Sequence, residues 1–561
     1  MGVSLRLVRV VTLFGSSLAA VTASAQVVPP TREEVSPPVA PAPAGPRVRV
    51  DGGIERAPCP LDDPAYANLK VTVTAAVFNN LKGVSPEELA PAYRAYLAQE
   101  RPISVVCDIR DAAATLLRNR GYLAAVQVPV QKIENGEVRF EVLYARLAAV
   151  RVRGEVGGAE RLIASYLEPL TRQEVFNRIE AERSLLLVRD LPGYDVRLTL
   201  RPAGTGPGEV VGDVTVTRTP YVVDLNVQNL AGRDTGPWGA QLRAQFFGLT
   251  GLGDRTSIAF YSTADFDEQQ ILQLAHDFRI GGQGLTISSR FNYAWTEPDI
   301  VDAQGNPFPV KARTLFANLE AGYPFLRTQA ANLRGALGLD FVNQEVKSLG
   351  TFLNRDRLRV AYVRLDVDAT DPRLGAAPGW RAAANVELRQ GLDLFDARSL
   401  LPRAFGDRTA TLARMSAYGE ARLAPNLSFS VAPRGQYAFD RLLSFERFSG
   451  GNYTIGRGYD PGTVIGDHGL GLAAELKVEQ WTPFGGRQIT LQPFAFADAA
   501  RVWEKGGRSE TLTSVGAGVR SGLFSRARLD ATLAVPLERA GPQNRRGDVR
   551  FLVSLTTKLL P

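Results

Sequence analysis

Histidine and cysteine are scarce in this chain, with two of each among 561 residues. His276 and His468 do not stand at ligand spacing to a cysteine, so no metal centre is expected. They are also the only candidate bases for a Ser-His-acid hydrolase site. His468 lies in a turn-like GDHG stretch, where a solvated turn residue is the simpler interpretation, and no nucleotide-binding loop occurs. We therefore predict that the protein is not an enzyme and carries no cofactor or metal.

Long apolar runs are also missing. Beyond residue 26 no stretch of about 18 apolar residues occurs, so membrane residence would require a closed β-barrel instead of spanning helices. The 45% hydrophobic content is too high for a disordered chain. The net charge of +7 comes from Lys and Arg scattered along the sequence rather than gathered in one stripe. Nucleic-acid binding is therefore not expected.

Residues 1–25 have the features of a secretory signal peptide. Two arginines precede an apolar stretch over residues 10–20, and an A-x-A cleavage site follows over residues 23–25. The alternative, an anchoring helix, needs about 20 apolar residues, and Gly and Ser interrupt a run that is already shorter. The chain is therefore expected to be exported and cleaved after Ala25.

The two cysteines, Cys59 and Cys107, would meet an oxidising compartment in an exported chain. We expect them to form a disulfide. On the chain-entropy model such a bond would stabilise its domain by about 4 kcal/mol. Two buried free thiols are the alternative.

The remaining sequence divides into a linker, two small modules and a long C-terminal region. Residues 26–68 are predicted to be a periplasmic linker, because seven prolines between positions 29 and 46 favour extended structure. Residues 69–147 and 148–217 each predict the order strand, helix, helix, strand, strand, which is an internal repeat of α+β architecture. The helices are expected over residues 86–100, 109–119, 159–167 and 176–187.

Residues 218–561 show period-two alternation, which is typical of β-strands. Apolar side chains such as Leu470 and Leu472 alternate with charged ones such as Glu475 and Lys477. An apolar outside around a polar lumen indicates a barrel in outer-membrane lipid, and about sixteen antiparallel strands suit a bacterial single-chain barrel. The predicted fold class is therefore α+β periplasmic modules followed by an all-β transmembrane barrel. The strands are expected to begin near Tyr221, Gly239, Thr256, Gln269, Leu285, Thr314, Leu333, Leu358, Trp380, Leu412, Leu427, Gly469, Gln488, Thr511, Arg526 and Val549.

One arginine occupies a long glycine-rich segment between two alternating runs. Residues 448–462 read FSGGNYTIGRGYDPG, in which Gly456 and Gly458 flank Arg457 and Tyr459 follows. Without neighbouring Cβ atoms the backbone can fold tightly and leave the guanidinium unobstructed.

A strand-like run downstream offers partners for this arginine. Phe494, Phe496 and Asp498 share its polar face, because successive side chains of a strand alternate between faces. A planar guanidinium can bind a carboxylate through two hydrogen bonds and stack on aromatic rings. We therefore expect Arg457 to bind Asp498, with Tyr459 and the two phenylalanines packed around the pair. The alternative is a surface-loop arginine and a strand-end aspartate that never meet.

With these motifs the chain resembles the TpsB transporters of two-partner secretion, the haemolysin secretion/activation family ShlB/FhaC/HecB, within the superfamily of barrel-assembly insertases. The family's VRGY loop motif is similar to residues 456–459, with glycine in place of valine, and its strand motif is similar to residues 494–498. The two modules resemble the family's POTRA modules at Cys107, Gly121, Tyr122, Gly136, Asp190, Leu191, Pro192 and Gly193.

The resemblance implies a transporter in the cell outer membrane, with the POTRA modules in the periplasm. Its sixth extracellular loop, here residues 441–468, would fold back into a barrel of sixteen strands, which is expected to be monomeric. The implied partner is a secreted exoprotein with an N-terminal secretion domain, moved without nucleotide hydrolysis. Some members have a plug helix, and the proline-rich segment predicts that such a plug is short, displaced or missing here. The exoprotein would add a strand to the second module near residues 176–187 and 194–200.

Two other functions remain open. A barrel-assembly insertase shares the loop motif, although the main bacterial insertase usually carries more modules. A passive pore would account for the barrel but gives no reason for two periplasmic modules.

Overall fold

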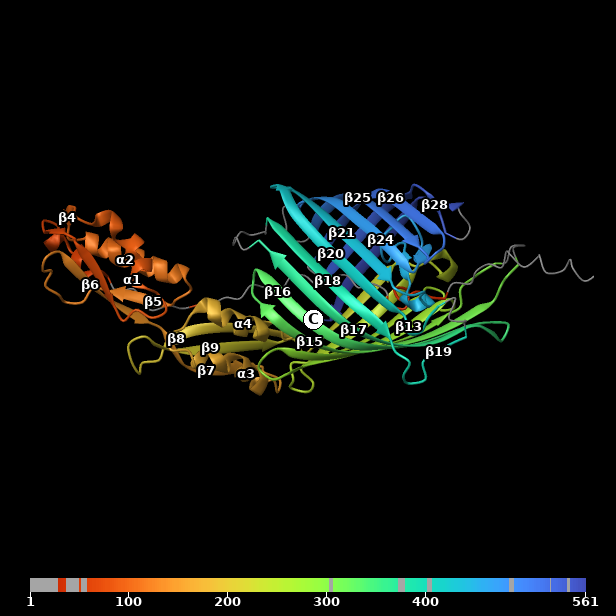
Figure 1. The fold of residues 1–561 in the computed structure, drawn as a ribbon, viewed down its shortest axis with the longest axis horizontal. Helices are drawn as coiled ribbons and strands as arrows, with labels where there is room; N and C mark the ends of the chain where they lie inside the picture. Colours follow the sequence, from red (N-terminus) through yellow and green to blue (C-terminus); the bar gives the residue numbers. More distant parts are fainter. Residues whose placement is uncertain are drawn as a thin grey trace, which may run out of the picture.

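The computed structural model describes residues 29–36, 50–51, 58–301, 306–371, 379–400, 406–483, 489–524, 526–541 and 545–560. The predicted signal peptide, residues 1–25, lies outside the described residues. The rest forms two small α+β modules followed by a barrel, and module 2 lies between module 1 and the barrel (Figure 1). No helix in the described part is long and apolar enough to cross a membrane.

Module 1 packs helix α2 (Val105–Asn119) on a three-stranded sheet in the order β3 (Ala75–Asn79), β6 (Glu137–Tyr144), β5 (Ala124–Gln127). Its core contains the fully buried Ile109 and Phe140, one from the helix and one from the sheet. Strands β2 (Lys70–Thr72) and β4 (Glu100–Pro102) form a separate pair.

The predicted helix over residues 86–100 is wrong. Helix α1 ends after Pro86–Leu89, and two short 3-10 turns, Ala90–Ala92 and Arg94–Tyr96, lead into β4. Pro91 lacks the N–H that an α-helix needs, and its ring would clash with the carbonyl four residues before it. The helix therefore stops one turn after its start, and the chain returns to extended structure.

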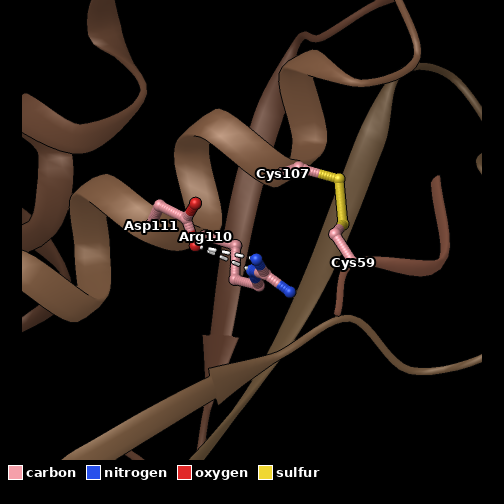
Figure 2. Close-up of a disulfide and its surroundings, with 4 residues drawn as sticks. All are labelled: Cys59, Cys107, Arg110 and Asp111. Atoms are coloured by element: carbon pink, nitrogen blue, oxygen red, sulfur yellow. Dashed lines mark hydrogen bonds and ion pairs between the residues drawn. A yellow bond between two sulfur atoms is a disulfide. The ribbon is translucent and has the colours of Figure 1, made fainter. Parts of the chain in front are cut away.

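Cys59 and Cys107 form a disulfide that ties the end of the predicted linker to the first turn of α2 (Figure 2). Their Cα atoms are 6.0 Å apart, and both residues are buried. Next to the bond, Arg110 binds the carboxylate of Asp111 at 2.9 Å. The described structure therefore has the pairing expected from an exported chain, not two free thiols.

Module 2 has helices α3 (Glu160–Thr171) and α4 (Arg178–Arg189), which pack on a sheet in the order β1-β8-β9-β7. These strands are β7 (Arg146–Gly154), β8 (Tyr194–Pro202), β9 (Glu209–Arg218) and the short β1 (Val50–Asp51). Strand β1 comes from the segment before module 1 and pairs in parallel with β8. The edge of β8 is therefore partly covered by a remote piece of the same chain.

Among the described residues, sixteen long antiparallel strands close a barrel, in which β10 pairs with β30. This confirms the predicted fold class, and most strands start within four residues of their predicted positions. A two-residue strand, β19 (Arg398–Ser399), adds to β17. The sixteen are β10 (Tyr221–Gln228), β11 (Gly239–Phe247), β12 (Arg255–Thr263), β13 (Gln269–Ile280), β14 (Leu285–Thr296), β15 (Val310–Arg327), β16 (Ala331–Ser348), β17 (Thr351–Thr370), β18 (Trp380–Gly391), β20 (Thr411–Ala424), β21 (Leu427–Ala438), β24 (His468–Val478), β25 (Ile489–Trp503), β26 (Ser509–Leu523), β27 (Ala527–Pro536) and β30 (Arg550–Leu560).

The alternation within the strands divides a lipid face from a lumen face. Leu470 and Leu472 of β24 are 58% and 46% exposed, whereas Lys477 of the same strand is buried. On β14 the indole of Trp295 points outward, and Asn292 is buried inside. The lumen is therefore lined with polar and charged side chains, as the sequence pattern predicts for a barrel in lipid.

The connection between β21 and β24 is folded into the lumen. It contains a 3-10 turn (Ser444–Glu446) and a small hairpin of β22 (Phe448–Gly450) and β23 (Val464–Gly466). Phe448 and Val464 are buried with Val502 of β25 and Leu512 of β26. The segment corresponds to the loop expected over residues 441–468.

A second segment also lies inside the barrel. Residues 31–36 belong to the stretch predicted to be a periplasmic linker, but they form a turn within the lumen. Val35 is fully buried in a cluster with Phe316 of β15 and Phe445 of the inward loop. The described residues of this segment form a turn and not a helix.

Candidate functional site

Arg457 and Asp498 meet inside the barrel. Arg457 Nε donates to Asp498 Oδ2 at 2.9 Å, and its Nη2 donates to Oδ1 at 2.7 Å. The backbone N–H of Arg457 also donates to Oδ2, at 3.0 Å. The Asp498 side chain is only 1% exposed, so this paired, charge-assisted contact lies away from bulk water. We call these two residues the loop-to-wall lock.

Glu475 and Arg520 extend the lock, and sequence reasoning did not identify either as part of it. Arg457 Nη1 donates to Glu475 Oε1 at 2.6 Å, and Arg520 Nη2 lies 2.9 Å from the same oxygen. The alternation along β24 places Glu475 on the lumen face, a signal that could have made it a candidate. Nothing local in the sequence of β26 distinguishes Arg520 from other lumen residues.

The two predicted phenylalanines have different contacts. The Arg457 guanidinium lies 3.6 Å from the centre of the Phe496 ring, whereas Phe494 lies beneath Arg520 at 4.1 Å. Phe496 therefore packs directly on the lock, and Phe494 supports it through a second cation–π pair. Gly516 and Gly518 of β26 leave room for these rings, because a Cβ at either position would lie 2.6 Å or less from a ring carbon.

The residues around Arg457 also fix the loop to the wall. Gly458 N donates to Ser514 Oγ at 3.2 Å, and the Tyr459 hydroxyl accepts from Glu538 N at 3.0 Å. Gly456 has a φ of +120°, and a Cβ there would lie 2.5 Å from Leu512. The three predicted residues around Arg457 thus lie where the loop touches β26 and the segment after β27.

Module 2 is attached to one end of the barrel. Asp190, just after α4, accepts two hydrogen bonds from Arg327 at the end of β15, at 2.6 and 2.7 Å. Leu191 lies close to Gly253 of the barrel, and Gly193 lies against Phe247. The family-like residues 190–193 therefore form a docking surface between module and barrel.

Replacing Asp190 with alanine should loosen this attachment without unfolding the barrel. The Asp190 side chain is 42% exposed, so the pair contributes at most about 1 kcal/mol, or roughly a fivefold change in an equilibrium. With the transport function that the family resemblance implies, a two- to fivefold loss is expected in a secretion assay. Asp195→Ala on β8 is the matched control, and exchanging the charges (Asp190→Arg with Arg327→Asp) should restore part of the loss. Equal transport by wild type and Asp190→Ala would show that the contact is dispensable.

The groove predicted in module 2 is not an open edge. Val50 and Asp51 pair with Leu198 and Thr199 in the middle of β8. Arg183 of α4 lies within hydrogen-bonding distance of the carbonyl oxygens of Gln283 and Phe325 at the barrel rim. An added strand would therefore have to displace β1 before it could follow the whole of β8.

Comparisons with known proteins give one family and several related folds. The sequence model of the family described as haemolysin secretion/activation protein ShlB/FhaC/HecB matches residues 211–521. Among solved structures, CdiB from Escherichia coli is similar with a TM-score of 0.68 and 17% identity, over 91% of this chain and 94% of that one. CdiB from Acinetobacter baumannii has a TM-score of 0.58 and 16% identity, with the same coverage of each chain.

A BamA from Haemophilus ducreyi lacking POTRA domains 1–3 is similar with a TM-score of 0.54 and 12% identity, over 88% of this chain and all of that one. At these identities the structural similarities establish the fold alone. No curated protein matches the sequence significantly.

Proposed function

Because the chain belongs to the haemolysin secretion/activation family ShlB/FhaC/HecB, we propose that it recognises a large partner exoprotein and secretes it through its barrel without nucleotide hydrolysis. The protein is an outer-membrane β-barrel of the transporter type, and its POTRA-like modules lie in the periplasm. The observation that best supports the proposal is the inward loop, which Arg457 and Asp498 hold against the barrel wall.

Capture would begin at the modules. An extended chain can add to an exposed sheet edge through main-chain hydrogen bonds, which tolerate varied side chains. Strand β8 of module 2 has nine residues, and β1 pairs with two of them. An exoprotein segment that replaced β1 would gain a longer ladder on a module already attached to the barrel through Asp190 and Arg327.

Conduction would require the lumen to be cleared. The loop and residues 31–36 both lie in it, which supports a closed resting state. The loop hairpin would leave β25 and β26 during transport, and the contact between Arg457 and Asp498 would return it to the wall afterwards. The free energy for outward movement would come from folding of the exoprotein outside the cell, since no nucleotide-binding loop occurs in the sequence.

A comparison of culture supernatants with and without this chain tests the proposal. We expect one large polypeptide to disappear from the supernatant of the deletion strain, while the other outer-membrane barrels stay at normal levels. A general loss of outer-membrane barrels would instead indicate the insertase function. An unchanged supernatant with normal barrels and reduced uptake of small solutes would indicate a passive pore.

A further inference from the structure

A second buried charge cluster lies at the base of the inward loop, away from Arg457. Its centre is Arg389 of β18, which is fully buried. Arg389 Nε and Nη2 donate to the two carboxylate oxygens of Glu446 at 2.8 and 2.9 Å. The same guanidinium donates to Asp340 of β16 and to Glu387, each at 2.6 Å. Glu446 belongs to the loop, so this contact is a second attachment of the loop to the wall.

The segment before module 1 contributes to the same cluster. Arg32 Nη2 donates to Asp340 Oδ2 at 3.0 Å, on the oxygen that Arg389 also contacts. Arg32 Nη1 lies 3.9 Å from Glu446, and its guanidinium lies over the rings of Phe316 and Phe445 at 5.3 and 6.0 Å. Arg32 therefore contacts both the wall and the loop.

Other contacts hold the segment in register. Asn292 Nδ2 of β14 donates to the Val35 carbonyl at 3.1 Å and to Ser36 Oγ at 2.6 Å. Gln344 Nε2 of β16 donates to the Pro30 carbonyl at 2.8 Å. These bonds place Arg32 in one position against the cluster.

Arg32 supplies one of the positive charges that neutralise the carboxylates of the cluster. Arg32, Arg389 and Arg414 supply three positive charges, with Arg414 3.2 Å from Glu446. Asp340, Glu387 and Glu446 supply three negative charges. Arg364 lies 3.9 Å from Glu387 and is a further cation for that carboxylate. Without Arg32, the buried Asp340 keeps Arg389 as its one ion-pair partner among the described residues, and Arg389 is shared with Glu387 and Glu446. An uncompensated buried carboxylate strongly destabilises the arrangement that contains it.

We propose that Arg32 is a positioning residue for the inward loop: it neutralises Asp340 beside Glu446, so that withdrawal of residues 31–36 loosens the base of the loop. The segment and the loop would then leave the lumen in a coupled manner. The inference rests on the gating role proposed for the loop. Its test measures the position of the loop and does not require the exoprotein.

The test uses a single reporter thiol on the loop. Ser449→Cys replaces a residue of β22 that is 5% exposed, and the two native cysteines are bonded to each other. Labelling of the purified full-length protein by a maleimide would therefore follow the fraction of molecules with an open loop. Adding Arg32→Gln should raise the labelling rate by about tenfold. Adding Arg32→Lys, which keeps the charge, should raise it much less.

A charge-balanced variant separates this role from a general loss of structure. Combining Arg32→Gln with Asp340→Asn also removes the carboxylate that has lost Arg32 as a partner, and should return the labelling rate most of the way to that of the parent. Arg290→Gln, an exposed lumen-facing arginine of β14 with no ion pair among the described residues, should have no effect. A parental rate for Arg32→Gln, or no rescue by Asp340→Asn, would overturn the inference. The labelling test does not involve the exoprotein, whereas the secretion assay does. A failure of the proposed role of Arg32 can therefore be told apart from a failure of the proposed secretion function.

Discussion

Replacing Arg457 with alanine should abolish most secretion and leave the barrel inserted in the outer membrane. The substitution removes both side-chain hydrogen bonds to Asp498 and leaves a carboxylate that is 1% exposed with only the backbone N–H of residue 457. Breaking a buried pair in this way costs about 3–5 kcal/mol. The strand ladders of the barrel do not involve this side chain, so folding and insertion should persist. Secreted exoprotein and heat-dependent gel mobility of the barrel measure the two effects separately.

Two further variants sharpen the expected result for Arg457. Arg457→Lys keeps a positive charge but cannot form the paired contact with Asp498 or stack as a planar group on Phe496, so intermediate secretion is expected. Arg501→Ala changes an exposed arginine on the same strand as Asp498 and should secrete normally. Wild-type secretion by Arg457→Ala would mean that the lock has no role in transport.

Replacing Gly451 with alanine should impair secretion about as severely as the loss of Arg457. Gly451 has a φ of +141°, and a Cβ there would lie 2.1 Å from the backbone oxygen of Asp460. The backbone conformation alone costs a residue with a side chain about 1–3 kcal/mol, and the clash with the main chain adds to this cost. The hairpin of β22 and β23 could then no longer present Arg457 to the wall. Secretion and labelling of a loop cysteine both measure the effect.

Gly506→Ala is the matched control for Gly451. Gly506 also has a positive φ, +74°, but a Cβ there would have no atom within 4 Å. It therefore carries a conformational cost without the clash, and secretion should stay close to normal. If both glycine variants secrete equally, the tight turn at residue 451 is not needed for seating the loop.

The barrel was predictable because its constraint is local. Each strand has its own period-two alternation, so the predicted strand starts at Tyr221, Gly239 and Leu285 agree with the structure. The largest difference is at β17, which begins at Thr351 and not near Leu358. Residues 351–354 read TFLN, which does not alternate, so the sequence does not define that end of the strand.

The lock could be predicted from the sequence because its residues belong to recognisable motifs. The cluster around Arg389 has no such motif. The alternation along β18 places Arg389 on the lumen face, but it does so for any other arginine at a lumen position too. Its partners Asp340 and Glu446 lie 49 and 57 residues away and are brought together only by barrel closure. The lumen position of residues 31–36 was missed for a similar reason, because prolines predict extended structure but not where the extended chain lies.

A cysteine cross-link between loop and wall tests most directly whether the loop lies in the lumen. A Cβ at Gly450 would be 3.7 Å from the Cβ of Ala500, within the usual range for a disulfide. Its closest contact, at 2.7 Å, would be Cγ2 of Val464, a side-chain atom that has to shift slightly. Ala499, the next residue, faces outward and provides the control. In the inserted barrel, Gly450→Cys with Ala500→Cys should form a disulfide under mild oxidation, identified by mass spectrometry of the linked peptides, and Gly450→Cys with Ala499→Cys should not. If both pairs stay reduced and react freely with maleimide, the loop is outside the barrel and the account is contradicted.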